Sequence, residues 1–218
     1  MKIKAILFLS FLLSLVACNE NKNKGSRVDR LPFYNDATFK THWIDARAKA
    51  LDTFHTISDF QLINQDGDSI SQLTFEDKIY VTDFFFATCT GICPKMTDNM
   101  LLLQKEFLED TDVLLLSHSV TPDADSVAVL NQYAKQKGID SKTWHLVTGP
   151  KNEIYKLGRK DYFIEEDLGL EKEDDDFLHT ENFVLIDKNR HIRGIYNGLN
   201  KTSVRQLITD IHTLKEEQ

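Results

Sequence analysis

The sequence predicts an α/β sandwich in which helices cover both faces of a central mixed sheet. Two apolar runs at 79–87 and 113–120 have the composition of buried strands, and each is followed by a segment of helical periodicity. A shorter run at 143–148 leads into a third helical segment. The end of the chain reads as a β-hairpin over 181–196 and an amphipathic helix over 202–214.

The N-terminal third contributes a tether, an extension and a hairpin. Residues 19–30 are rich in Asn, Lys and Ser and read as a flexible tether. Residues 31–52 predict a packed extension, with Phe39, Trp43 and Ile44 on one face of a helix. The segment 54–64 alternates loosely, and the turn sequence at 65–68 joins it to a second short strand at 69–71.

The first central strand is nearly all apolar apart from Thr82 and Asp83, which predicts a strand covered on both faces. A helix is expected from about Cys93 to Leu108. Its first turn contains Pro94, where the missing N–H costs nothing. Apolar side chains recur through it at helical spacing, namely Met96, Met100, Leu103 and Phe107.

The next strand is expected to lead into a helix that begins at Thr121–Asp123 and ends at Gly138. Its predicted buried side consists of Val127, Leu130, Tyr133 and Ala134. The helix after the third strand is expected to run to about Arg159, and the acidic residues of 165–176 are read as a solvated loop. This order of elements is that of a thioredoxin-like three-layer sandwich with a C-terminal hairpin and helix.

The first 18 residues resemble an export signal. Lys2 and Lys4 precede an apolar run over 5–17, which is too short to span a bilayer but fits a signal peptide. Residues 15–18 resemble a bacterial lipobox, so Cys18 is expected to carry lipid; in the alternative, the signal is an ordinary one and Cys18 is incidental. The predicted organisation is therefore a lipoprotein signal at 1–17, a lipidated, tethered extension at 18–52 and one domain at 53–218.

Composition narrows the function classes. The formal net charge is −8, and removal of Lys2 and Lys4 with the signal would take it to −10, which argues against a nucleic-acid surface. With Cys18 lipidated, Cys89 and Cys93 are the only thiols left in the domain. A secreted domain stapled by disulfides would need more cysteines, so these two are read as a working pair.

Cys89 and Cys93 lie where a buried strand gives way to a helix N-terminus. The free N–H groups and the positive end of the helix dipole stabilise a thiolate there. A lowered thiol pKa serves both disulfide exchange and the binding of soft metal ions such as Cu(I). The Cys-x-x-x-Cys spacing alone does not choose between these uses.

A histidine near the pair would favour metal binding. His42, His55 and His212 are expected on the surface and His191 beside the hairpin turn, while His118 and His145 are expected as packed neutral residues within strands. His179 ends the acidic loop directly before a strand. In this fold that junction faces the cysteine loop, although the residues alone leave its ligation open.

Several ordered segments resemble the Sco/SenC family of copper-binding thioredoxin-like proteins. They are the stretch 84–96 that contains both cysteines, the stretches 119–123 and 144–149, and the pair His179–Thr180, within a likeness from about residue 58 to the C-terminus. The resemblance implies a membrane-tethered extracytoplasmic protein, and together with the lipobox it predicts a lipoprotein of the bacterial cell envelope. Such proteins deliver copper to the CuA centre of cytochrome c oxidase or keep its cysteines reduced. It also implies that Cys89, Cys93 and His179 hold one copper ion, as Cu(I) or Cu(II).

The partners implied are the copper-bearing subunit of the oxidase and, as further candidates, other copper chaperones or thiol reductants. Two positions depart from the family pattern. Leu178 stands where an aspartate usually precedes the histidine, which affects the support of the imidazole ring. Thr121 stands where aspartate is common.

Three alternatives to a copper metallochaperone follow from the residues. The first is a thiol–disulfide oxidoreductase, in which Cys89 would attack a partner disulfide and Cys93 would resolve the mixed disulfide. A peroxiredoxin-like peroxidase would use the Thr-x-x-Cys spacing of 90–93, although Phe86 occupies the usual upstream proline position. In the last, Cys89 and Cys93 form an inert disulfide, which their expected exposure disfavours.

Overall fold

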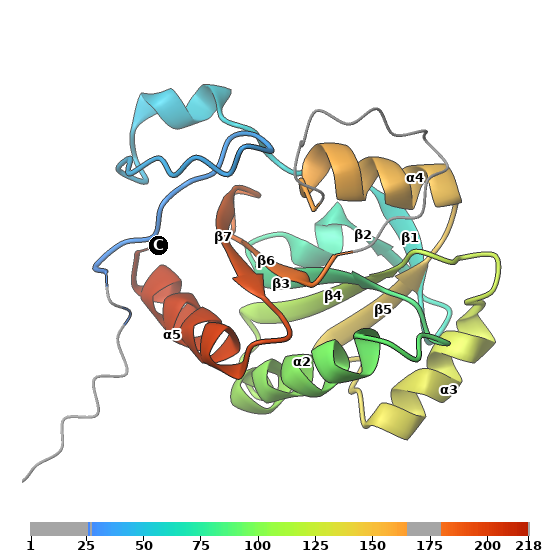
Figure 1. Cartoon of the computed structure of the whole chain (residues 1–218). Coiled ribbons are helices and arrows are strands. Elements are labelled where there is room, and N and C mark those ends of the chain that lie inside the picture. Colours follow the sequence, from blue (N-terminus) through green and yellow to red (C-terminus); the bar gives the residue numbers. More distant parts are fainter. Residues whose placement is uncertain (1–25, 27, 165–179, 218) are drawn as a thin grey trace, which may run out of the picture.

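Seven strands form one mixed sheet at the centre of the protein (Figure 1). The computed structural model describes residues 26, 28–164 and 180–217. The strand order is β2-β1-β5-β4-β3-β6-β7; the neighbouring pairs β3–β4 and β4–β5 are parallel, and the other neighbouring pairs are antiparallel. The strands are β1 (Gln61–Asn64), β2 (Ser69–Ser71), β3 (Ile79–Phe85), β4 (Val113–Ser119), β5 (Trp144–Thr148), β6 (Asn182–Ile186) and β7 (Ile192–Asn197).

Helices cover both faces of this sheet, which confirms the predicted fold class. The helices α2 (Cys93–Phe107), α3 (Val127–Lys137) and α5 (Lys201–Glu217) pack on one face, and α4 (Lys151–Lys156) packs on the other (Figure 1). A π-helical turn, η3 (Leu157–Asp161), continues α4, and two short 3-10 helices are η1 (Lys49–Thr53) and η2 (Gln72–Phe75). No helix among the residues described here is long and apolar enough to cross a membrane.

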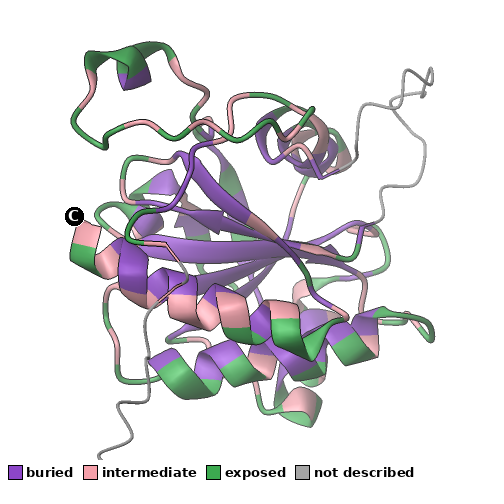
Figure 2. Ribbon diagram, turned by 60° about the vertical axis from the view of Figure 1, so that its left-hand side comes forward, coloured by how far each residue is buried: buried purple, intermediate pink, exposed green. Residues whose placement is uncertain are grey.

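The central strands are buried along their whole length, as their apolar composition predicts (Figure 2). Because side chains alternate along a strand, each strand supplies both cores. Val81 and Leu115 are paired in register and pack with α2, α3 and α5, whereas Tyr80 and Leu116 pack with α4.

Two local predictions are wrong. The helix after β4 begins at Val127 instead of Thr121–Asp123, because the Ser126 hydroxyl caps it by accepting from the Val129 N–H at 3.4 Å. The extension at 31–52 is not a helix with an apolar face: Trp43 is 58% exposed, and the extension is held instead by buried Leu31 and Phe33. A β-bridge between Phe33 and His42 folds this segment back on itself.

His118 and His145 are packed within strands, as predicted. His118 is fully buried, with its ring stacked on Phe84 at a centroid distance of 4.7 Å and its Nδ1 3.1 Å from the hydroxyl of Thr82. Its Nε2 has no hydrogen-bond partner among the described residues. Burial lowers the pKa of His118 to about 3 and also lowers the pKa of His145.

The burial of His118 predicts a loss of stability in acid. The unfolded histidine takes up a proton near pH 6.5, whereas the folded one does so only near its pKa of about 3. Stability is therefore present above pH 6.5 and is lost as the pH falls below it, by about 2 kcal/mol from His118 at pH 5. Urea unfolding at pH 7 and pH 5 should show that His118→Phe loses less stability than the wild type. An equal loss in both proteins would contradict this.

Candidate metal centre

Residues 86–92 form the loop that joins β3 to α2, and we call this segment the cysteine loop. The N–H of Cys89 donates to the carbonyl of Phe86 at 3.2 Å, which turns the chain directly after the strand. Helix α2 begins at Cys93 with Pro94 in its first turn, as predicted. Its N-cap residue, Ile92, makes no side-chain capping bond, so backbone N–H groups of the first turn stay available to the neighbouring sulfurs.

The two cysteines are free thiols in different surroundings. Cys89 is partly exposed, and Cys93 is only 5% exposed within the core beneath α2. Burial acts to raise the pKa of Cys89, but hydrogen bonds from the Cys93 thiol and from the N–H groups of Cys93, Gly91 and Ile92 lower it below its usual value. Burial and the hydrogen bond to Cys89 raise the pKa of Cys93 to about 12.

In this arrangement Cys89 is the thiol of the pair that loses its proton first, and Cys93 is the one that donates a hydrogen bond to it. A thiolate beside a second thiol is suited to attack on a disulfide, since the second sulfur can resolve the product. The same two sulfurs are adjacent soft donors, which fits a thiophilic ion such as Cu(I). The donor set therefore fits copper as well as redox exchange.

The other predicted site residues, His179 and Cys18, lie outside the described residues. The chain re-enters the described part at Thr180, a buried residue whose hydroxyl accepts from the N–H of Asn182 at 3.1 Å. Strand β6 then runs antiparallel to β3, with Val184 opposite Thr82. Because the two strands run in opposite directions, β6 begins beside the end of β3 from which the cysteine loop departs.

Within 26, 28–164 and 180–217, no three His, Cys, Asp or Glu side chains lie where they could hold one metal ion. His118 contacts Phe84 and Tyr162, and His145 contacts Phe75, so both rings belong to the core on the α4 face. These two histidines are thus separated from Cys93, which belongs to the opposite core.

Near the cysteines lies a buried series of hydrogen-bonded polar side chains that the sequence did not predict. The indole of Trp144 donates to the Ser117 hydroxyl at 2.8 Å, and this hydroxyl donates to the carboxylate of Asp83. Burial raises the pKa of Asp83 to about 7, although the bond from Ser117 acts to lower it. The charge of Asp83 in turn contributes to the raised pKa of Cys93. The available signal in the sequence was Asp83 itself, the one acidic residue in a strand that is otherwise apolar except for Thr82.

A second feature missed from the sequence is Asp125, a fully buried carboxylate that accepts a hydrogen bond from the cysteine loop at Ala87. The sequence predicted that this residue lies inside the helix after β4. Its neighbours Ser119 and Thr121 both carry hydroxyls, which was the one indication of a polar cluster at this end of the strand.

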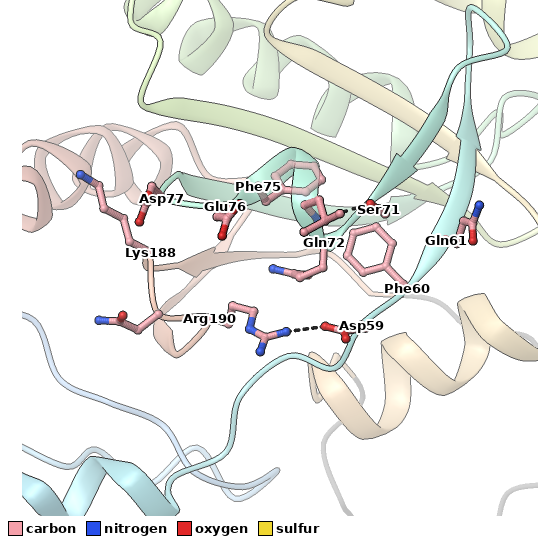
Figure 3. A pocket seen from close by; sticks show the side chains of 12 residues that line it. Asp59, Phe60, Gln61, Ser71, Gln72, Phe75, Glu76, Asp77, Lys188 and Arg190 are labelled. Atoms are coloured by element: carbon pink, nitrogen blue, oxygen red, sulfur yellow. Dashed lines mark hydrogen bonds and ion pairs between the residues drawn. The ribbon is translucent and has the colours of Figure 1, made fainter.

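A groove of about 720 Å³ lies at the opposite end of β3 from the cysteine loop (Figure 3). It is bounded by Glu76 and Asp77, which precede β3, and by the turn between β6 and β7. The ion pair of Arg190 with Asp59, at 2.6 Å, crosses it (Figure 3). Neither cysteine lines this groove, so it is not part of the candidate site.

Comparisons with known proteins agree with this geometry. The protein-family model described as SCO1/SenC matches residues 48–216. The structure is similar to that of a SCO1/SenC family lipoprotein from Bacillus anthracis, with a TM-score of 0.64 and 31% identity over 74% of this chain and 95% of that one. It is also similar to BsSco, a member of the Sco family of cytochrome c oxidase assembly proteins for which a disulfide switch is described, with a TM-score of 0.61 and 28% identity over 73% and 93%.

A third similar structure is that of Arabidopsis thaliana ScoI with copper bound. The TM-score is 0.56 and the identity 22%, over 71% of this chain and 97% of that one. At this identity the likeness supports the fold.

Proposed function

The chain belongs to the SCO1/SenC family, and from this membership we propose that it is a copper metallochaperone for the assembly of cytochrome c oxidase. The observation that carries the proposal is the pair of free thiols at the start of α2, one partly exposed with a lowered pKa and one buried beside it. Copper is the cargo. It is received at the exposed end of the sheet and passed by ligand exchange to the copper-bearing subunit of the oxidase, at its CuA site.

Cys89 and Cys93 bind one copper ion through their sulfurs in this proposal, and the imidazole of His179 is the third ligand. Two thiolates favour Cu(I), and an added imidazole lets the same site hold Cu(II). The position of Thr180 supports the third ligand, because β6 begins beside the end of β3 that carries the cysteine loop. Leu178 gives the imidazole no carboxylate neighbour at the preceding position.

The proposed location is the cell envelope, outside the cytoplasm. Residues 1–17 would be removed as a lipoprotein signal, Cys18 would carry the lipid, and residues up to 52 would connect it to the domain at 53–218. Support comes from the lipobox-like sequence at 15–18 and from the Bacillus anthracis relative, which is described as a lipoprotein. Other copper chaperones or thiol reductants are the candidate donors to the site.

Copper titration of the reduced protein tests the ligand set. The wild type should bind one copper ion per chain and show a Cu(II)–thiolate charge-transfer band, because both sulfurs ligate. Cys89→Ser and Cys93→Ser should each weaken and shift the band, because one thiolate ligand remains, and His179→Ala should shift it and weaken Cu(II) binding at least tenfold. His42→Ala, at a half-buried histidine of the extension, serves as the control.

Equally tight Cu(II) binding by the wild type and His179→Ala would rule out the three-ligand site. A reduced wild-type protein without any charge-transfer band would rule out sulfur ligation and leave the redox function.

The split between the two thiol pKa values favours a second candidate function, thiol–disulfide exchange. The Cys89 thiolate would attack a partner disulfide, forming a mixed disulfide and releasing one partner thiolate. Cys93 would then lose its proton and attack the Cys89 sulfur, which releases the second partner thiolate. Two electrons thereby pass from the pair to the partner, whose cysteines become reduced and able to accept copper.

The exchange reaction has its own signature. Cys93→Ser should accumulate the mixed disulfide with a test substrate, detectable by mass, because the resolving sulfur is gone. His179→Ala should exchange at the wild-type rate, since no step needs an imidazole. If the wild type reduces no test disulfide, the exchange function is excluded and copper binding is unaffected.

A further inference from the structure

The cysteine loop is tied to the neighbouring β4–α3 connection through the carboxylate of Asp125. This side chain has no solvent exposure, and three donors converge on its Oδ2. They are the N–H of Ala87 at 3.1 Å, the Ser119 hydroxyl at 2.6 Å and the Thr121 hydroxyl at 3.1 Å. Its Oδ1 has no hydrogen-bond partner among the described residues.

The bond from Ala87 comes at the point where the chain leaves the sheet. The ladder between β3 and β4 ends at the pair Phe85 and Ser119, and the N–H of Val120 closes it by donating to the carbonyl of Phe85 at 2.9 Å. Two residues further along the loop, Ala87 is held by Asp125. Cys89 follows after two more residues, so this contact fixes the start of the segment that carries the partly exposed thiol.

We propose that Asp125 is the positioning residue of the thiol pair, and that its carboxylate holds the cysteine loop in the geometry in which Cys89 and Cys93 are preorganised as free thiols. The proposal rests on the proposed function of this pair. A carboxylate suits the task because charge-assisted hydrogen bonds are roughly twice as strong as neutral ones. Because the Asp125 side chain is buried, its proposed action is through its hydrogen bond to the backbone of Ala87.

Thr121 belongs to the same group of hydrogen-bonded residues around Asp125. Its hydroxyl donates to Asp125, and its carbonyl accepts from the N–H groups of Ala124 and Asp125, each at 2.9 Å. An aspartate at 121 could donate nothing to Asp125 and would add a second negative charge beside it. The threonine is therefore matched to the buried carboxylate, and Thr121→Asp should disturb the cysteine loop more than Thr121→Ser.

The test measures the thiol pair of the mature protein in two ways. One is the equilibrium of the Cys89–Cys93 disulfide with glutathione, followed by alkylation and mass without copper; the other is Cu(I) affinity by competition. The hydrogen bonds to Asp125 are present when both thiols are free, and in the proposal they stabilise that form. Loss of these hydrogen bonds should therefore favour the disulfide. We expect Asp125→Ala to shift the glutathione equilibrium toward the disulfide at least tenfold and to weaken Cu(I) binding at least tenfold. Asp125→Asn, which keeps an acceptor for Ala87, should recover most of both.

Two controls separate positioning from stability and from charge. Ile70→Ala creates a cavity at a buried position of β2, at the edge of the sheet. It should lower stability by an amount comparable to Asp125→Ala without changing the cysteine loop. Asp123→Ala removes an exposed charge two residues from Asp125. Neither control should change the equilibrium or the affinity.

The outcomes are distinguishable. Equal shifts in Asp125→Ala and Ile70→Ala, compared at matched loss of unfolding free energy, would overturn the positioning role. Unchanged values in Asp125→Ala would also overturn it, while copper binding by the wild type would leave the proposed function standing. A wild type that binds no copper, with the glutathione shift still present in Asp125→Ala, would support the positioning role and refute the copper function.

Discussion

Replacing Asp83 with asparagine is expected to stabilise the protein at pH 8 by about 4 kcal/mol and to change little at pH 4. The pKa of this buried carboxyl is raised from 3.8 to about 7, so the unfolded chain loses the proton at a lower pH than the folded one. Stability therefore falls as the pH rises from about 4 to 7, and the cost is complete above 7. Asparagine avoids the cost because it is never charged, and its amide oxygen can still accept from Ser117.

Urea unfolding at pH 4, 6 and 8 measures this effect. The stability gain of Asp83→Asn over the wild type should grow with pH, since only the wild type has to bury an ionised carboxylate. Asp52→Asn, at an exposed carboxyl of η1, is the matched control and should give no pH-dependent gain. A constant gain at all three pH values would mean that shape, not charge, explains the result.

The same substitution should change the thiol chemistry. The charge of Asp83 contributes to the raised pKa of Cys93, so Asp83→Asn should lower that pKa and speed the alkylation of Cys93 above pH 8. A stabilising substitution that alters the reactive thiol is typical of a site that keeps an unfavourable group for function. In this protein the charge of Asp83 adds to burial and to the Cys89 hydrogen bond in raising the pKa of Cys93.

Much of the fold follows from the sequence because the strongest signals are local. The apolar runs that became β3 and β4 are long, and the helix between them carries its apolar side chains at regular spacing, so both element types were predictable. The thiol pair was equally visible, since a strand followed by Cys-x-x-x-Cys-Pro places both sulfurs at a helix start without knowledge of tertiary contacts.

The residues that tune the site were hidden because their contacts are non-local or depend on loop geometry. The sequence places Asp125 inside the predicted helix, whereas the β4–α3 turn brings its carboxylate to the N–H of Ala87, 38 positions away in the chain. The hydrogen bonds from Trp144 to Ser117 and from Ser117 to Asp83 connect three different strands, and no periodicity in the sequence indicates them. The prediction for the extension failed for a related reason, because its buried residues are covered by later parts of the chain. Leu31 packs in the core to which α5 contributes, and Phe33 contacts the rings of Phe54 and His191 and the guanidinium of Arg193.

The second large effect is expected at Arg193, a residue that is only 2% exposed. Its guanidinium donates to Asp187 at 3.1 Å and to Glu217 at 2.6 Å, and also to the carbonyls of Leu31 at 2.8 Å and Pro32 at 3.1 Å. Arg193→Met would leave both carboxylates without this buried cation. Because a broken buried ion pair costs about 3–5 kcal/mol, the free energy of unfolding in urea should fall by that amount.

Loss of the Arg193 guanidinium should also release the N-terminal extension, because this group lies over the ring of Phe33 at 3.9 Å. Limited trypsin digestion of Arg193→Met should therefore cut within residues 30–49 faster than in the wild type. Arg190→Met is the matched control: its ion pair with Asp59 is exposed, so it should cost about 1 kcal/mol or less and leave the cleavage rate unchanged. Equal costs at Arg190 and Arg193 would show that the extension is held by apolar contacts alone.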